Sequence, residues 1–76
     1  MRDKDIIRLK QLGEHLAKLR IKKSLSQRGL SSLCDVDYGK ISKLENNKAN
    51  LTVTTLIELA EGLGVHPKEL LNIDFE

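Results

Sequence analysis

The sequence lacks several features that would place the chain among secreted or membrane proteins. It contains one cysteine, Cys34, so no internal disulfide can form. The chain therefore suits a reducing compartment or is indifferent to one. No apolar run approaches the roughly 20 residues of a transmembrane helix, and the N-terminal segment MRDKDIIRLK lacks the apolar stretch of a signal peptide. These absences predict a cytoplasmic protein.

Signals for β-structure and for catalysis are also scarce. The sequence has no hairpin dipeptide and no long alternation of β-branched and polar residues. It has no internal repeat, no linker, no glycine-rich phosphate loop and no nucleophile–base pair. We therefore expect one all-α domain over residues 1–76 that is not an enzyme and holds no cofactor.

Metal ligands are too dispersed to predict a site. His15 falls in the middle of an expected helix, whereas His66 falls at the end of a distant helix. Asp35 lies in neither of these two helices. Cys34 has no cysteine neighbour and lies on the expected packing face, so it is expected to be a small core residue. We therefore expect no metal.

Charge is distributed unevenly along the chain. Residues 1–50 carry twelve Lys or Arg against six Asp or Glu, a balance of +6, whereas residues 51–76 carry one against five, a balance of −4. This asymmetry favours a basic face for a polyanion and an acidic side turned away from it. A random division of solvated charges is the alternative, and charge alone does not decide between them.

Apolar residues recur at spacings of three and four, which predicts amphipathic helices. Gly13 falls inside the first of them and is expected to cost about 1 kcal/mol relative to alanine. The polar segment KKSLSQRGL ends this helix and starts the next. The apolar stripe of the first helix consists of Ile6, Leu9, Leu12, Leu16 and Leu19.

Local signals define the ends of the other helices. Gly64 is expected to end the fourth helix, and Pro67 at a first helical position opens a short fifth. The N-caps of the second, third and fourth helices are expected to be Ser26, Asp37 and Thr52.

The second and third helices have the packing pattern of a helix-turn-helix unit, whose second helix enters the major groove of DNA. Two short helices at this angle require apolar or small residues at defined places. Asp35 lies at the sharp turn and is expected to adopt a left-handed backbone, which Asp tolerates. Counted from Gln27, the residues at the required places are Leu30, Ser31, Cys34, Val36, Ile41 and Leu44.

Five segments in order carry a resemblance to a known family: LAKLR, LSQRGLSSL, YGKISKLENNK, TLIELAEGLGV and HPKELL. Over about residues 12–71 the chain resembles the phage-repressor-type helix-turn-helix domain, the Cro/repressor-like or Xre family. The resemblance implies a five-helix lambda-repressor-like DNA-binding domain with the helix-turn-helix at helices two and three. The chain departs from the family at Ser31, where alanine is usual, and at Asp35, where glycine is usual. Arg28 and Gly29 replace the usual acidic residues and remove the reciprocal capping carboxylate.

The outward face of residues 38–46 is polar, and we expect it to read DNA. Tyr38, Gly39 and Lys43 are expected to contact bases, with Lys43 suited to guanine O6 and N7. The family resemblance implies a phosphate contact by the Gln27 amide at the start of its helix. The other expected phosphate contacts are Arg28, Lys40, Asn46 and Lys48.

Each of these roles has an alternative that involves no contact with DNA. The polar face could be ordinary solvated surface, Tyr38 a half-buried packing residue, and Gln27 a neutral helix start. Asp37 either only caps its helix or also accepts a hydrogen bond from a cytosine amine. The resemblance further implies a partly buried ion pair between Arg20 and Glu45, which we interpret as scaffold.

The predicted function is sequence-specific binding of double-stranded DNA by a transcriptional regulator. We expect a small repressor that acts as a homodimer on a palindromic operator. The rival is a protein-binding module of the same fold, either an antitoxin that binds a toxin or an antagonist of another regulator. The expected dimer interface, which could instead simply close the core, consists of Leu70, Leu71, Ile73 and Phe75.

Overall fold

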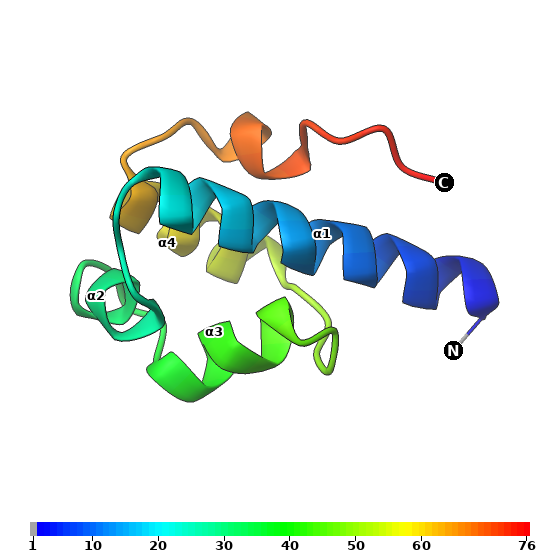
Figure 1. Cartoon of the computed structure of the whole chain (residues 1–76), viewed down its shortest axis with the longest axis horizontal. Helices are drawn as coiled ribbons and strands as arrows, with labels where there is room; N and C mark the ends of the chain where they lie inside the picture. Colours follow the sequence, from blue (N-terminus) through cyan, green and yellow to red (C-terminus); the bar gives the residue numbers. More distant parts are fainter. Residues whose placement is uncertain (1) are drawn as a thin grey trace.

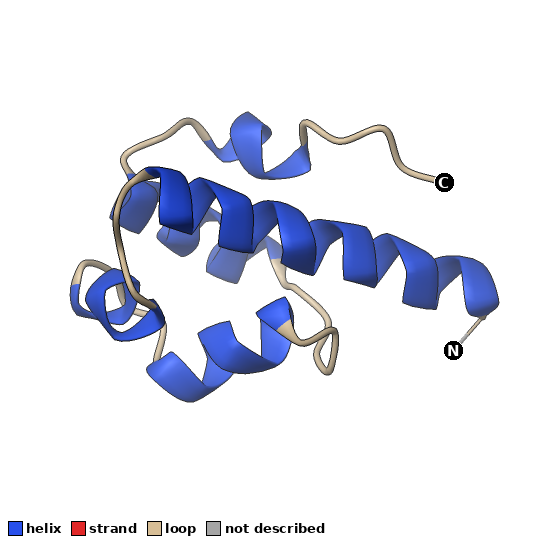
Figure 2. Cartoon of the chain, viewed as in Figure 1, coloured by secondary structure: helices blue, strands red, loops and turns tan. Residues whose placement is uncertain are grey.

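The computed structural model describes residues 2–76 as four α-helices followed by a short 3-10 helix, with no strand in that range (Figures 1 and 2). The fifth helix expected from the sequence is this 3-10 helix, so the α-helix count is four rather than five. None of the described helices is long and apolar enough to cross a bilayer. The elements are α1 (Asp3–Lys22), α2 (Gln27–Ser32), α3 (Tyr38–Glu45), α4 (Val53–Leu63) and η1 (Pro67–Leu71).

Helix α1 is the longest element, and the others are arranged around it. Figure 1 shows α3 on one side of α1 and η1 with the C-terminal tail on the opposite side, whereas α4 lies behind. Helix α2 lies at the C-terminal end of α1 and leads into α3. This arrangement leaves the outer side of α3 uncovered by the other helices.

Polar side chains cap the helices where the sequence predicted. Ser26 Oγ accepts from the Gly29 N–H at 2.9 Å, and Asp37 Oδ1 accepts from the Lys40 N–H at 2.9 Å. Thr52 caps α4 in the same way, and Gly64 ends that helix with a left-handed φ of 71°. Such caps stabilise short helices because they satisfy backbone donors that lack an intrahelical partner.

The core draws on every helical element. Burying one such aliphatic side chain contributes about 1.5–3 kcal/mol, so a small domain needs contributions from all of them. Leu70 of η1 is only 1% exposed, and it therefore closes the core of its own chain. The buried apolar residues are Leu16, Leu30, Val36, Ile41, Leu44, Leu56, Leu59, Ala60, Leu63 and Leu70.

At Gly13, α1 closely approaches the end of α3. A Cβ atom at this position would collide with the Leu44 carbonyl oxygen and would lie 2.9 Å from Asn47 Oδ1. The glycine that looks like a weak point in the sequence therefore permits a close helix–helix approach. The cost in helix propensity is offset by this packing.

The turn between α2 and α3 corrects one prediction. Asp35 does not have a positive φ; among non-glycine residues described by the structure only Ser24 and Asn47 do, at 59° and 63°. The Asp35 N–H instead donates to Glu58 Oε1 of α4 at 2.9 Å. The turn is thus fixed by a hydrogen bond to a neighbouring helix rather than by a left-handed residue.

Candidate nucleic-acid interface

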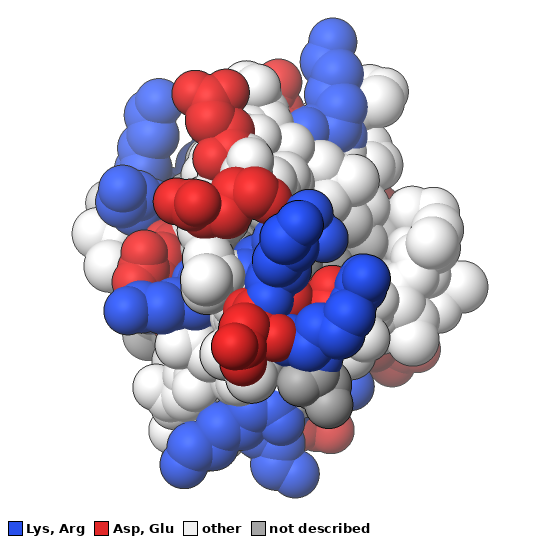
Figure 3. All heavy atoms as spheres, turned by 90° about the vertical axis from the view of Figure 1, so that its right-hand side faces the viewer, with Lys and Arg blue, Asp and Glu red and all other residues white. Residues whose placement is uncertain are grey.

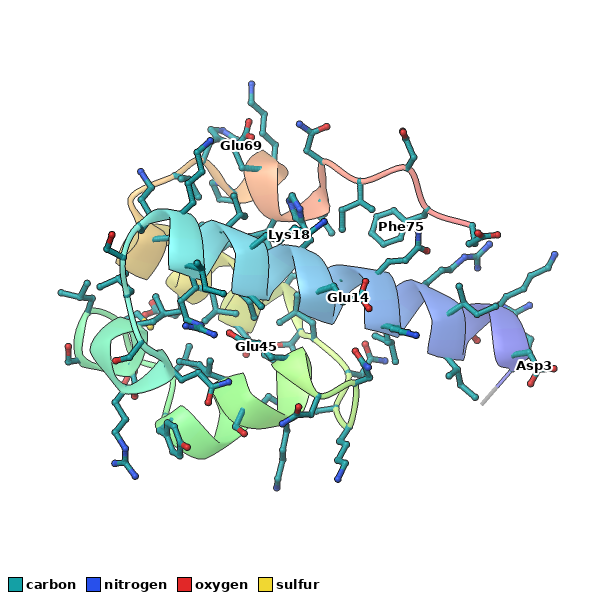
Figure 4. All side chains as sticks on the ribbon, viewed as in Figure 1. Asp3, Glu14, Lys18, Glu45, Glu69 and Phe75 are labelled. Carbon is teal, nitrogen blue, oxygen red and sulfur yellow. The ribbon has the colours of Figure 1, made fainter. Side chains whose placement is uncertain are left out.

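Helix α3 has one buried face and one exposed polar face. Ile41 and Leu44 are 0% and 4% exposed, and they fix the helix against the core. Residues three and four apart share a face, so Ile41 and Leu44 define the inward side. Gly39 and Lys43, four residues apart, share another side. Gly39 and Lys43 are exposed on that outer side, and Lys40 is half-buried. Side chains on this side extend away from α1 in Figure 4.

Part of the positive charge predicted from the sequence lies on this side of the molecule, and further Lys and Arg side chains lie at the centre, left and upper edge of Figure 3. In Figure 3 mostly Lys and Arg side chains occupy the lower edge of the view, the side on which α3 lies in Figure 1. Lys48 follows α3, and its backbone N–H donates to the Lys43 carbonyl oxygen at 2.8 Å. The two exposed lysines therefore belong to one local structure at the C-terminal end of α3. Such a basic face favours the approach of a polyanion.

Arg20 and Glu45 join the C-terminal ends of α1 and α3. Arg20 Nε donates to Glu45 Oε2 at 2.7 Å, and Arg20 Nη2 donates to Glu45 Oε1 at 2.8 Å. The hydrogen bonds with Glu45 raise the pKa of Arg20 above its ordinary value. The third nitrogen, Arg20 Nη1, donates to the Leu25 carbonyl oxygen at 2.8 Å. One guanidinium therefore fixes both α3 and the chain between α1 and α2.

Gln27 belongs to the same polar network, which the sequence did not reveal. Its Nε2 donates to Glu45 Oε1 at 3.0 Å, so the side chain links the start of α2 to the end of α3. The amide carries a second N–H and an oxygen, and neither has a partner among residues 2–76. A phosphate contact by Gln27 therefore stays a prediction, now from a side chain that is already oriented.

Tyr38 and Arg28 lie against each other at the junction of α2 and α3. The guanidinium carbon of Arg28 is 4.3 Å from the centroid of the Tyr38 ring, within the range of a cation–π contact. Tyr38 is nevertheless 40% exposed. The ring packs against a neighbour and also remains available at the surface.

Asp37 caps α3 through Oδ1, which establishes one of its two possible roles. Gly39 lies close to this cap, since a Cβ there would meet only Asp37 Oδ1, at 3.2 Å. Asn46, the C-cap residue of α3, donates from Nδ2 to Ser42 Oγ at 3.4 Å. The surface of α3 around Gly39 is therefore open, as a close approach to DNA would require.

Cys34 and the two histidines have structural partners. The Cys34 thiol donates to the Leu30 carbonyl oxygen at 3.3 Å, and burial raises its pKa. His15 Nε2 lies 2.6 Å from the Glu69 carbonyl oxygen, and His66 Nδ1 accepts from the Lys68 N–H at 3.1 Å as the cap of η1. Over residues 2–76 no group of three or more His, Cys, Asp or Glu is placed to hold a metal ion.

The residues expected at a dimer interface separate into two environments. Leu70 is buried in the core, which is the alternative that the sequence left open for this segment. Leu71 and Phe75 are 50% and 41% exposed, and Ile73 is half-buried. Phe75 lies beside α1 (Figure 4). Of these four residues, Leu71, Ile73 and Phe75 therefore offer apolar surface to a partner, and Leu70 does not.

The tail that carries Ile73 and Phe75 is hydrogen-bonded to α1. Gln11 Nε2 donates to the Asp74 carbonyl oxygen at 3.0 Å, and Gln11 Oε1 accepts from the Glu76 N–H at 3.1 Å. Arg8 Nε donates to the Glu76 carbonyl oxygen at 2.9 Å. These bonds hold an irregular segment in one place on the helix surface.

Comparison with known proteins places this geometry in a family. The sequence profile of the family Helix-turn-helix (HTH_3) matches residues 16–70. The chain belongs to this family of DNA-binding transcriptional regulators. The resemblance to the Xre family is confirmed by this match. The all-α helix-turn-helix fold predicted from the sequence is also confirmed, with a 3-10 helix in place of the fifth α-helix.

Curated relatives and solved structures agree with this assignment. The HTH-type transcriptional regulator y4dJ of Sinorhizobium fredii is 39% identical over 62 residues, which cover 82% of this chain and 80% of the relative. The control protein C.BamHI of Bacillus amyloliquefaciens is 33% identical over 61 residues, covering 79% and 75%. The restriction-modification controller protein C.AhdI of Aeromonas hydrophila has a similar structure, with a TM-score of 0.78, 32% identity and coverage of 82% and 94%.

One solved relative includes DNA. The restriction-modification controller protein C.Esp1396I is known as a tetramer in complex with its natural 35 base-pair operator. It has a TM-score of 0.73 with this helix-turn-helix chain, at 29% identity and with coverage of 84% of this chain and 95% of the relative.

Proposed function

We propose that this helix-turn-helix protein is a small repressor that binds a palindromic operator as a homodimer. The observation that carries the proposal is the exposed polar face of α3, fixed from behind by the buried Ile41 and Leu44. Sequence reading requires side chains on a rigid element that reaches base edges in the major groove. The Arg20–Glu45 pair and the Asp37 cap supply that rigidity at the two ends of α3.

The side chains divide between reading and holding. Tyr38, Gly39 and Lys43 lie along α3 from its first turn and are assigned to base contacts. Other polar side chains on and around α3 are assigned to phosphates, because contacts to the DNA backbone set the register of the protein on the duplex. They are Gln27, Arg28, Lys40, Asn46 and Lys48.

Dimerisation follows from the small size of one reading surface. A single recognition helix covers only a few base pairs, so two copies related by a two-fold axis on half-sites about one helical turn apart are needed for specificity. The operator-bound tetramer of C.Esp1396I supports an oligomeric mode of action for this chain. Leu71, Ile73 and Phe75 supply the apolar surface that we assign to the interface.

Binding to duplex DNA at several salt concentrations tests the proposal. Each half of the dimer offers three basic side chains to phosphates, Arg28, Lys40 and Lys48. Release of counterions from six phosphates gives a plot of log affinity against log salt with a slope of about −5. The test DNA is a site selected from random duplexes, with a scrambled duplex as control. Absence of binding to any duplex at low salt would refute the proposed function.

A further inference from the structure

The contact between Arg28 and Tyr38 connects two elements of the reading surface. Arg28 belongs to the first turn of α2, and Tyr38 is the first residue of α3. The guanidinium carbon lies 4.3 Å from the ring centroid. A cation over an aromatic face at this distance is attracted by the ring quadrupole even at an exposed site. The stack therefore restricts an exposed side chain that would otherwise sample many rotamers.

The contact with Tyr38 leaves the N–H donors of the guanidinium free. Arginine carries five N–H donors in the plane of the group, and the cation–π contact, with Cζ over the Tyr38 ring, uses none of them as a hydrogen bond. Within residues 2–76, no acceptor receives a hydrogen bond from Arg28 and no carboxylate pairs with it. Tyr38 remains 40% exposed beneath it. An oriented guanidinium with an unused donor edge is suited to O6 and N7 of guanine.

We propose that Arg28 and Tyr38 form one DNA-reading unit, in which the Tyr38 ring holds the Arg28 guanidinium so that its donor edge meets a guanine. This inference rests on the proposed function and deepens it. It makes Arg28 a residue that reads a base, instead of the phosphate contact assigned from the sequence. Tyr38 is then the positioning residue for Arg28. Its ring has this role regardless of which group the Tyr38 hydroxyl contacts.

A double-mutant cycle on the preferred duplex tests the coupling. Arg28→Ala should weaken binding about tenfold in the wild-type background, the loss expected for one bidentate base contact. In the Tyr38→Phe background the same change should cost the same factor, because phenylalanine keeps the ring. In the Tyr38→Ala background it should cost less than about threefold, because the guanidinium is no longer held. An equal factor in all three backgrounds would overturn the inference.

Arg28→Lys separates base reading from phosphate contact. Lysine keeps the positive charge but lacks the planar fork. We expect Arg28→Lys to weaken the preferred duplex nearly as much as Arg28→Ala, while binding to a scrambled duplex stays within about twofold of wild type. Wild-type affinity of Arg28→Lys for the preferred duplex would make Arg28 a phosphate contact and overturn the assignment.

Proton NMR of the free protein tests the stack without DNA. The chain has one tyrosine, one phenylalanine and no tryptophan. Phe75 lies on the tail, on the opposite side of α1 from α3 (Figures 1 and 4), so an upfield ring-current shift of the Arg28 Hδ protons reports on Tyr38. The shift should persist in Tyr38→Phe and disappear in Tyr38→Ala. A shift that is absent from the wild type would overturn the inference and leave the proposed function standing. A wild-type protein that binds no duplex would overturn both.

Discussion

Glu45 accepts two hydrogen bonds from Arg20, at 2.7 and 2.8 Å, and the two side chains are only 6% and 13% exposed. The pair joins the last turn of α1 to the last turn of α3, while Gln27 adds a third bond from α2. The same carboxylate thus serves all three helices around the reading surface. A change at Glu45 is expected to act on the scaffold first and on DNA binding only through it.

Replacing Glu45 by alanine should lower the free energy of unfolding by about 3 kcal/mol, because Arg20 would remain buried without its partner. Thermal and urea unfolding measure this loss. The matched control is Asp5→Ala, which removes the exposed partner of Arg2 at 3.1 Å and should leave the melting temperature nearly unchanged. Equal melting temperatures for Glu45→Ala and wild type would contradict the structural role of the pair.

The helix-turn-helix was predictable because its signals are local. The caps Ser26, Asp37 and Thr52 each bond to a backbone N–H three residues away, and the spacing of Ile41 and Leu44 identifies the buried face of α3. Such features are encoded within one turn of helix, so a single sequence reveals them.

Features that depend on a distant partner were missed or misread. The sequence presents Gly13 only as a weak helix former, whereas in the structure the Leu44 carbonyl oxygen lies against it. The sequence predicts a left-handed backbone at Asp35, but the turn is fixed by Glu58, 23 positions along the chain. The anchoring of the tail by Gln11 also crosses most of the sequence. No local pattern specifies which side chain will lie opposite after folding.

Gly13→Ala should destabilise the protein although alanine is the better helix former. The added methyl group would press on the backbone of Leu44, which cannot rotate away, so we expect a loss of about 1–3 kcal/mol. Gly39→Ala is the control, because its Cβ would meet only a side-chain oxygen at 3.2 Å. In chemical denaturation, the free energy of unfolding of Gly13→Ala should be clearly lower than that of Gly39→Ala. A gain in stability at Gly13 would mean that α1 and α3 are not in close contact.

Removal of residues 73–76 should weaken dimerisation and leave a folded core. The buried residues end at Leu70, so the tail contributes only its hydrogen bonds to α1 and the apolar surface of Ile73 and Phe75. We expect stability to fall by about 1.5–3 kcal/mol, the net contribution of the three exposed hydrogen bonds to α1 at about 0.5–1 kcal/mol each. Analytical ultracentrifugation measures the dimer.

Gln11→Ala is the control for this truncation. It removes the bonds to Asp74 and Glu76 while keeping the apolar residues, so it should reduce dimerisation less than the truncation does. Sedimentation at the same mass for wild type and truncated protein, across the concentration range of dissociation, would remove the tail from the interface.

Lys43 and Lys48 are neighbours, because the backbone N–H of Lys48 donates to the carbonyl oxygen of Lys43. We nevertheless expect different roles for them: Lys43 contacts a base, and Lys48 contacts a phosphate. Lys43 lies within α3, one turn after Gly39, whereas Lys48 lies beyond the C-cap Asn46. Lys43→Ala should therefore cost about 1–3 kcal/mol on the preferred site and relax the preference at one base pair. Lys48→Ala should weaken all sequences alike and reduce the salt slope by about one unit for each phosphate that is no longer neutralised.

Each variant is a control for the other, because both remove one exposed lysine from the same end of α3. The measurement is a set of salt titrations on the preferred duplex and on versions with single base-pair changes. The salt slope reflects how many phosphates the protein neutralises, and the spread of affinities among the changed duplexes measures base reading. If Lys43→Ala weakens every duplex by the same factor and lowers the slope as Lys48→Ala does, then Lys43 contacts a phosphate. Base reading by α3 would then depend on Tyr38 and Gly39, at the N-terminal end of the helix.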